Sequence, residues 1–164
     1  DEYRVTVPTE PQKMTVLIVP PMQEPYIKEI STGLEALQKE VGGRIEVVYP
    51  FAEPVGLICN DEGKNERMEL NRALYDAEDN MYDIIAGTFV LAGLSGDNFG
   101  SLDKDQIKQF SERFAKPEMF MRINGKITAV EVKPSIKAKL DRLQKEQNNT
   151  DKPQPQKKPR EETL

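Results

Sequence analysis

The feature that most restricts the fold is a short apolar run, residues 15–19, that ends at two consecutive prolines, Pro20 and Pro21. A continuous apolar run of this length is typical of a strand that is buried on both faces. Proline cannot donate a hydrogen bond to a neighbouring strand, so the pair marks the end of the element. We therefore predict a central strand at this position.

A helix is predicted next, because Pro25 suits a first turn and Gly42-Gly43 suits a helix end. The spacing of the apolar residues between them follows the 3,4,3,4 pattern of one helical face. Alternating residues over 44–49 predict a second strand, and the apolar run 55–59 predicts a third. The residues on the helical face are Ile27, Ile30, Leu34, Leu37 and Val41.

The middle of the chain is less regular. Residues 60–64 have turn chemistry and are expected to end the third strand, and residues 66–75 fit either a short helix or a strand. A turn at Asp79-Asn80 leads into a buried strand over 82–94. Within that strand, Gly87 and Gly93 predict a bend or a close approach of the backbone.

Two later signals are sharper. Asp103 followed by Gln106 resembles a capping box, and the helix that it begins is expected to stop before Pro117. Alternating apolar residues over 119–132 flank Asn124-Gly125, which is the strongest short signal for a β-hairpin.

These elements together predict a single α+β domain over residues 14–132. It would contain a mixed sheet of about five or six strands, two main helices and a C-terminal β-hairpin. Residues 1–13 are expected to be a linker or the remnant of an upstream region. From Lys133 the chain becomes polar and basic, so residues 133–164 are expected to form a tail, with a short helix followed by disorder.

The chain contains no histidine, no tryptophan and a single cysteine, Cys59. Histidine is the usual proton shuttle near neutral pH and a common metal ligand, so its absence argues against catalytic triads and most zinc sites. We therefore expect no catalytic residue, no metal and no cofactor. Cys59 lies in an apolar run and is expected to be buried, and a lone thiol predicts a reducing, cytoplasmic location. The longest apolar stretch, residues 84–94, is too short to span a bilayer, which needs about 20 residues.

Charge is segregated along the chain. Residues 14–132 carry 12 basic and 20 acidic side chains, a balance of −8, whereas residues 133–164 carry a balance of +4. An acidic body repels phosphate backbones, so direct binding of nucleic acid by the body is not expected. A partner with a basic surface is the favoured alternative, although most acidic domains of this size are acidic for solubility alone.

Two polar segments are candidate binding sites. The loop with Gly93, Gly96 and Gly100 could hold a phosphate on backbone amides, although it lacks both standard nucleotide-binding patterns. The carboxylates over 76–83 could hold a hard cation, but a calcium loop beginning at Asp76 needs glycine where Met81 stands, so a solvated turn is favoured.

Asn71-Arg72 is the most distinctive polar pair. An arginine between Leu70 and Leu74 must reach solvent or meet a carboxylate or a phosphate. Exposure to solvent is the favoured interpretation of Arg72.

A resemblance to a known family rests on several short motifs in a fixed order. They are Leu-Glu-Ala-Leu-Gln (34–38), Ile-Glu-Val-Val (45–48), Cys-Asn-Asp-Glu-Gly-Lys (59–64), Leu-Asn-Arg-Ala-Leu (70–74) and Asp-Ile-Ile-Ala-Gly-Thr-Phe (83–89). The succession resembles an uncharacterised family, domain of unknown function 3846, over roughly residues 15–132. That family is similar to modules of phages and of conjugative elements in Gram-positive gut bacteria, so the resemblance implies a mobile-element origin. The positions that match its motifs and carry polar or glycine residues are the candidate ligand-binding residues Asn60, Glu62, Gly63, Asn71 and Arg72.

Two functions from different classes follow. The first is a non-enzymatic protein that binds and inhibits a host DNA-defence enzyme of the restriction or CRISPR type, with carboxylates that imitate DNA phosphates. The alternative is a small-ligand or nucleotide-binding accessory module of a larger mobile-element protein. The candidate partner-binding residues are the carboxylates Asp76, Glu78, Asp79, Asp83 and Asp97.

Overall fold

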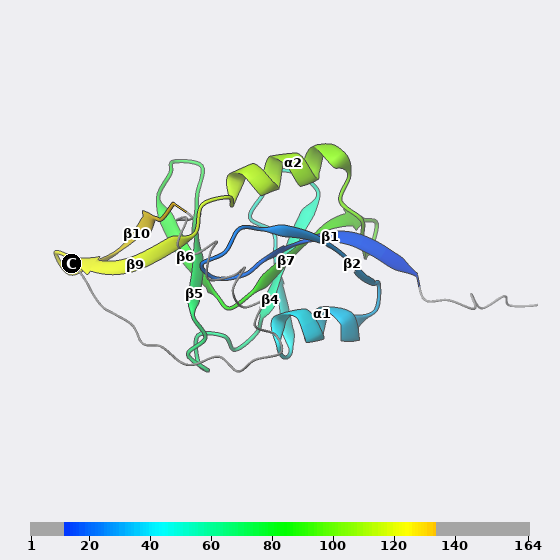
Figure 1. Cartoon of the computed structure of the whole chain (residues 1–164), viewed down its shortest axis with the longest axis horizontal. Helices are drawn as coiled ribbons and strands as arrows, with labels where there is room; N and C mark the ends of the chain where they lie inside the picture. Colours follow the sequence, from blue (N-terminus) through cyan, green and yellow to red (C-terminus); the bar gives the residue numbers. More distant parts are fainter. Residues whose placement is uncertain (1–11, 134–164) are drawn as a thin grey trace, which may run out of the picture. The chain divides into compact units, whose positions relative to one another are not determined.

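The computed structural model describes residues 12–133. Six strands form the main sheet, in the order β2-β1-β7-β4-β3, with β8 paired to β7 (Figure 1). Every neighbouring pair in this sheet is antiparallel. The strands are β1 (Lys13–Val19), β2 (Tyr26–Ser31), β3 (Ile45–Val48), β4 (Val55–Asn60), β7 (Phe89–Ser95) and β8 (Asn98–Gly100).

One helix covers each face of this sheet. Figure 1 shows α1 (Leu34–Val41) and α2 (Lys104–Arg113) on opposite sides of β1 and β7. Leu17 packs in the cluster that contains Phe110 of α2, and Val16 packs in the cluster that contains Leu37 of α1. Neighbouring residues of β1 thus face opposite layers, as strand geometry requires. The prediction of a central strand that is buried on both faces is confirmed.

Two further β-hairpins complete the described part of the chain. β5 (Leu70–Tyr75) pairs with β6 (Met81–Ala86), and β9 (Glu118–Ile123) pairs with β10 (Lys126–Glu131). The first hairpin joins the core on the α2 side of the main sheet, where Leu74 and Ile85 are buried. The second contacts β5 through Glu118, whose Oε1 accepts a hydrogen bond of 2.9 Å from the backbone N–H of Ala73.

The expected α+β class, single domain and C-terminal hairpin are confirmed. The sheet differs in detail, because its neighbouring strands are antiparallel throughout and residues 98–100 add a short strand. The expected capping box is present: Asp103 Oδ1 accepts from Gln106 N at 2.8 Å, and Gln106 Oε1 accepts from Asp103 N at 3.0 Å. Asn124 and Gly125 both adopt positive φ, as a tight hairpin turn requires.

The helix expected from Pro25 onwards was wrong in its first half. Residues 26–31 form β2, which pairs with β1 from Tyr26 to Ser31, and only residues 34–41 are helical. An edge strand satisfies the backbone donors and acceptors that β1 would otherwise leave unpaired, and isoleucine favours extended structure. The 3,4 spacing of Ile27 was coincidental, since this side chain is 57% exposed.

The expected strand over 82–94 is instead two strands, β6 and β7, joined at Gly87. Gly87 has φ of +82°, so the chain turns there, as its glycine predicted. The sequence of residues 66–75 fitted either a short helix or a strand, and residues 70–75 form a strand.

The predictions for residues 1–11 and 134–164, including the helical or disordered tail, lie outside the described residues. Within residues 12–133, neither helix has the length or the apolar content to cross a bilayer.

Gly93 is required by a close approach of the backbone. A Cβ at this position would lie 2.5 Å from the carbonyl oxygen of Ser101. Gly93→Ala is therefore expected to lower the free energy of unfolding by about 1–3 kcal/mol, measured by urea denaturation, because the backbone must shift. Gly100→Ala, in the residue paired with Gly93, is the matched control, since its nearest neighbour would be 4.0 Å away. Equal losses in the two variants would contradict this explanation.

Candidate functional site

A hollow of about 340 Å³ opens between β3, β4, β6 and the loop that follows β4. It brings together three of the residues predicted as ligand-binding, Asn60, Glu62 and Gly63, with Asp83 of the predicted acidic set. Sequence reasoning did not assign Glu46, Asp61 and Lys64, which also line it. Glu46 and Cys59 are cross-strand partners in the β3–β4 ladder, so their side chains share a face of the sheet.

Asn60 and Gly63 hold the loop in place. The Asn60 side chain donates from Nδ2 to the carbonyl oxygen of Val41 at 3.1 Å, and its Oδ1 accepts from the backbone N–H of Glu62 at 2.7 Å. A Cβ at Gly63 would lie 2.9 Å from the carbonyl oxygen of Ala86, so the loop lies against β6. Both residues are buried, and both stabilise the conformation of the loop. This structural role explains why they occur in the motif, without a bound ligand.

The rim of the hollow carries more negative than positive charge. Arg44 Nη2 lies 3.0 Å from Asp61 Oδ2 and 3.2 Å from Glu62 Oε2, and Lys64 Nζ lies 2.6 Å from Asp83 Oδ1. The side chains of Arg44 and Lys64 are 71% and 58% exposed. Ion pairs this exposed contribute little to stability, so both cations can leave their carboxylates at small cost.

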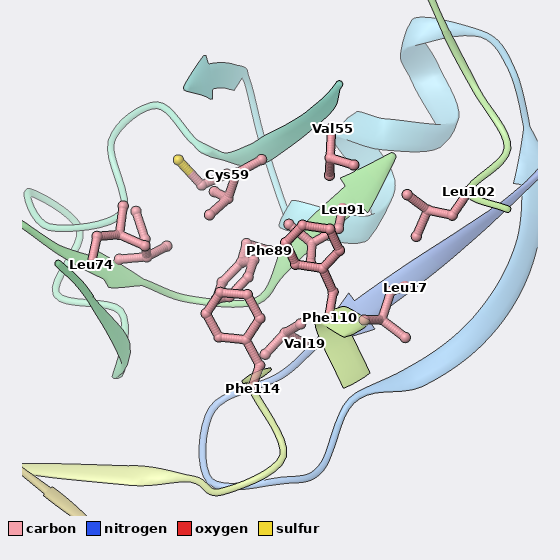
Figure 2. Packing of buried hydrophobic residues seen from close by; sticks show 12 residues of the cluster. Leu17, Val19, Val55, Cys59, Leu74, Phe89, Leu91, Leu102, Phe110 and Phe114 are labelled. Atoms are coloured by element: carbon pink, nitrogen blue, oxygen red, sulfur yellow. The ribbon is translucent and has the colours of Figure 1, made fainter. Parts of the chain in front are cut away.

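Cys59 is buried, as predicted, and lines the hollow from below. Figure 2 shows its sulfur directed away from the rings of Phe89 and Phe114 in the core. Burial, together with the smaller effect of the nearby carboxylates Glu46 and Asp83, raises the pKa of the Cys59 thiol to about 11. The thiol is therefore protonated at neutral pH and is a poor nucleophile.

The other two predicted ligand-binding residues, Asn71 and Arg72, lie elsewhere and are fully buried. The expectation that Arg72 is exposed was wrong. Its Nη2 donates to the carbonyl oxygens of Gln23 at 2.8 Å and Phe114 at 2.7 Å, and its Nη1 donates to Asn71 Oδ1 at 2.8 Å. A longer bond of 3.4 Å reaches the carbonyl oxygen of Pro20.

These bonds join the β1–β2 loop, β5 and the end of α2. Asn71 adds two more through Nδ2, to Val19 O at 2.8 Å and Gly87 O at 2.9 Å. Burial lowers the pKa of Arg72 to about 10, and the charge of Glu118 partly opposes this shift. The guanidinium thus donates its hydrogen bonds to backbone carbonyl groups and to Asn71, and it is not available to a ligand.

Four of the five predicted partner-binding carboxylates lie on the β5–β6 hairpin. Asp76, Glu78 and Asp79 are exposed in its turn, where Asp76 Oδ1 accepts from the backbone N–H groups of Glu78 and Asn80, both at 2.9 Å. Asp83 follows on β6. The fifth, Asp97, lies in the turn between β7 and β8, outside this hairpin.

The solvated turn expected for the carboxylates over 76–83 is confirmed for residues 76–80, which are exposed, whereas Asp83 lies on β6. No group of three or more carboxylate or thiol side chains within residues 12–133 is arranged to hold a metal ion.

The phosphate-binding loop considered at Gly93, Gly96 and Gly100 was wrong. Gly93 and Gly100 face each other in the β7–β8 ladder, and Gly96 forms the turn between these strands. The N-terminus of α2 is already capped by the side chain of Asp103. An anion would have to displace this carboxylate.

Comparison with known proteins gives one match. A family model described as "Domain of unknown function (DUF3846)" matches residues 14–115, which includes the hollow, both helices and the β5–β6 hairpin and ends before β9. No curated protein and no solved structure matches the chain.

Proposed function

The chain belongs to the DUF3846 family, and we propose that this member is a non-enzymatic protein of a mobile genetic element that binds a host DNA-defence enzyme. In this proposal the target is a restriction or CRISPR enzyme in the cytoplasm. The protein inhibits it by offering carboxylates to the basic groove in which DNA would lie.

The observation that carries this proposal is the acidic region around the hollow and the β5–β6 turn. We define this acidic region by seven carboxylates, and Arg44 and Lys64 are the cations paired with them. Because those two cations are largely exposed, the basic side chains of a partner can replace them. The seven residues are Glu46, Asp61, Glu62, Asp76, Glu78, Asp79 and Asp83.

The β5–β6 hairpin also groups carboxylates closely. Asp76, Glu78 and Asp79 lie in its turn, and Asp83 follows on β6. An extended chain rises about 3.3 Å per residue, so Asp79 and Asp83 stand within about 14 Å of each other. A basic groove lined with arginine and lysine attracts such a group of charges at long range, and the attraction weakens with salt.

The alternative, a module that binds a small ligand, is favoured by a different observation, the hollow itself. Its volume of about 340 Å³ is within the range of small-molecule sites. Carboxylates dominate its rim, which opposes a nucleotide or any other phosphate ligand. An anionic ligand was considered because of Arg72. Arg72 is fully buried, so it cannot bind such a ligand.

The test is capture of a partner by the full-length chain from a Gram-positive bacterial lysate, at low and high salt, followed by a DNA-cleavage assay with the captured enzyme. The proposal predicts a DNA-processing enzyme that is recovered at low salt and whose cleavage of DNA is inhibited. Capture that does not weaken with salt, or an enzyme that still cleaves DNA at full rate, would contradict it.

A matched pair of triple variants locates the effect. Glu62→Gln, Glu78→Gln and Asp79→Asn together remove three charges from the acidic region, and each leaves a side chain of similar size. Each of these three exposed charges is expected to contribute about 0.5 kcal/mol to the free energy of binding the enzyme, so inhibition is expected to weaken about tenfold. The control removes three exposed carboxylates outside the region, Glu29→Gln, Asp97→Asn and Asp105→Asn, and is expected to inhibit like the unmodified chain.

A further inference from the structure

The hollow has a more specific role within the proposed function. We infer that it receives one organic cation, a guanidinium or ammonium group on an aliphatic stem, supplied by an arginine or lysine side chain of the partner. This inference rests on the proposed function, and it names the chemical group that the acidic region recognises at the hollow.

Four carboxylates converge on this open hollow. Glu46 comes from β3, Asp61 and Glu62 from the loop after β4, and Asp83 from β6, and all four line the same hollow. No ion pair within residues 12–133 involves Glu46. An incoming cation therefore meets one carboxylate that has no ion-pair partner within residues 12–133 and three whose partners there are exposed and replaceable.

A buried thiol, Cys59, also lines the hollow. Cys59 is 5% exposed, and no hydrogen bond to its Sγ occurs in the described part of the chain. A thiol sulfur accepts weakly from an N–H donor, so it adds a soft acceptor below the carboxylates. Ile85 and Ala86 supply apolar lining beside it. Arginine and lysine combine an aliphatic stem with a charged head, and this combination of surfaces suits them.

The chain already places cations at these carboxylates. The guanidinium of Arg44 bridges Asp61 and Glu62, and the ammonium of Lys64 contacts Asp83. These contacts show that the three carboxylates accept N–H donors from guanidinium and ammonium groups. A partner's side chain would use the same geometry and would gain contact with Glu46 and Cys59.

The test is an NMR titration of the full-length chain with agmatine, which carries a guanidinium at one end of an aliphatic stem and an ammonium at the other, and with succinate as the anionic control. Agmatine is expected to shift the amide signals of residues 59–64 and 84–86 in a saturable way, with a Kd of about 1–10 mM. Succinate is expected to leave them in place. Absence of saturable shifts up to about 50 mM agmatine would overturn the inference.

Variants separate the hollow from general electrostatics. Glu46→Gln with Asp83→Asn is expected to weaken agmatine binding at least about tenfold, because it removes two of the four carboxylates that line the hollow. Asp97→Asn with Asp105→Asn removes the same charge elsewhere and is expected to leave the Kd within about twofold. The amide spectrum of each variant reports directly whether its fold is retained. Equal weakening in both pairs would overturn the inference.

Competition decides the source of the cation and keeps the two proposals distinguishable. If agmatine releases the captured enzyme, the cation comes from the partner, as inferred. If agmatine binds but the enzyme stays bound, a partner side chain is ruled out and a free organic cation occupies the hollow. If the enzyme binds the Glu46→Gln, Asp83→Asn variant as tightly as the unmodified chain, the inference fails. The proposed function still stands in that case if the Glu62, Glu78 and Asp79 triple variant inhibits less.

Discussion

Replacing Arg72 with methionine is expected to lower the free energy of unfolding by about 3–5 kcal/mol. Methionine fills much of the same space, so the loss measures the hydrogen bonds rather than a cavity. Without the guanidinium, the carbonyl oxygens of Gln23 and Phe114 and the side chain of Asn71 lose their donor in a buried environment. Each buried acceptor without a partner costs about 1–3 kcal/mol.

Urea denaturation followed by circular dichroism measures this loss. A domain of this size has a free energy of unfolding of about 5–15 kcal/mol. The variant is therefore expected either to show a clearly lower unfolding midpoint or to be unfolded without urea. Arg122→Met is the control, because Arg122 is exposed and makes one long hydrogen bond, of 3.3 Å, to Gly125 O. It is expected to change stability by less than about 0.5 kcal/mol. A similarly small change for Arg72→Met would show that the buried guanidinium does not hold these segments together.

Replacing Phe110 with alanine is expected to cost about 3–5 kcal/mol. Phe110 is fully buried on the inner face of α2, and its ring centroid lies 4.6 Å from that of Phe51. Removing the ring leaves a cavity between the helix and the sheet, in the cluster that also contains Leu17 and Phe114. Figure 2 shows Phe110 among these side chains.

The same denaturation measurement applies, with Ile107→Ala as the comparison within one helix. Ile107 is half-buried at the edge of the same cluster, so a loss of about 1 kcal/mol is expected. The ratio of the two losses tests the packing of α2. Equal losses would mean that the helix does not sit on the sheet through Phe110.

Local sequence signals predicted the elements whose structure is decided locally. The apolar run before Pro20 is the central strand β1, and the Asp103 capping box begins α2. Asn124-Gly125 forms the turn of the β9–β10 hairpin. In each case the side chains or the backbone preferences of a few neighbouring residues determine the conformation.

Tertiary pairing explains what sequence reasoning missed. Residues 26–31 have helical spacing, but the free edge of β1 makes them a strand. Arg72 is buried because carbonyl groups from distant segments, at Gln23 and Phe114, meet it. No local pattern indicates such an arrangement.

The candidate site was predicted in part. Asn60, Glu62 and Gly63 were identified by their motif and do meet at the hollow, whereas Asn71 and Arg72 belong to the core. Glu46 was missed because its proximity to Cys59 depends on the register of β3 with β4. That register is set by which residues of each strand can be buried, and this is decided only in the assembled sheet.

The most direct test of the proposed function is a competition between this protein and DNA for the captured enzyme. The measurement is the affinity of the enzyme for a fluorescent DNA duplex in the presence of increasing concentrations of the full-length chain. The account predicts that the chain displaces the duplex completely, and that displacement weakens about tenfold when Glu62, Glu78 and Asp79 are neutralised. Simultaneous binding of the chain and the DNA to the enzyme would contradict it, because the acidic region would then not occupy the DNA-binding groove.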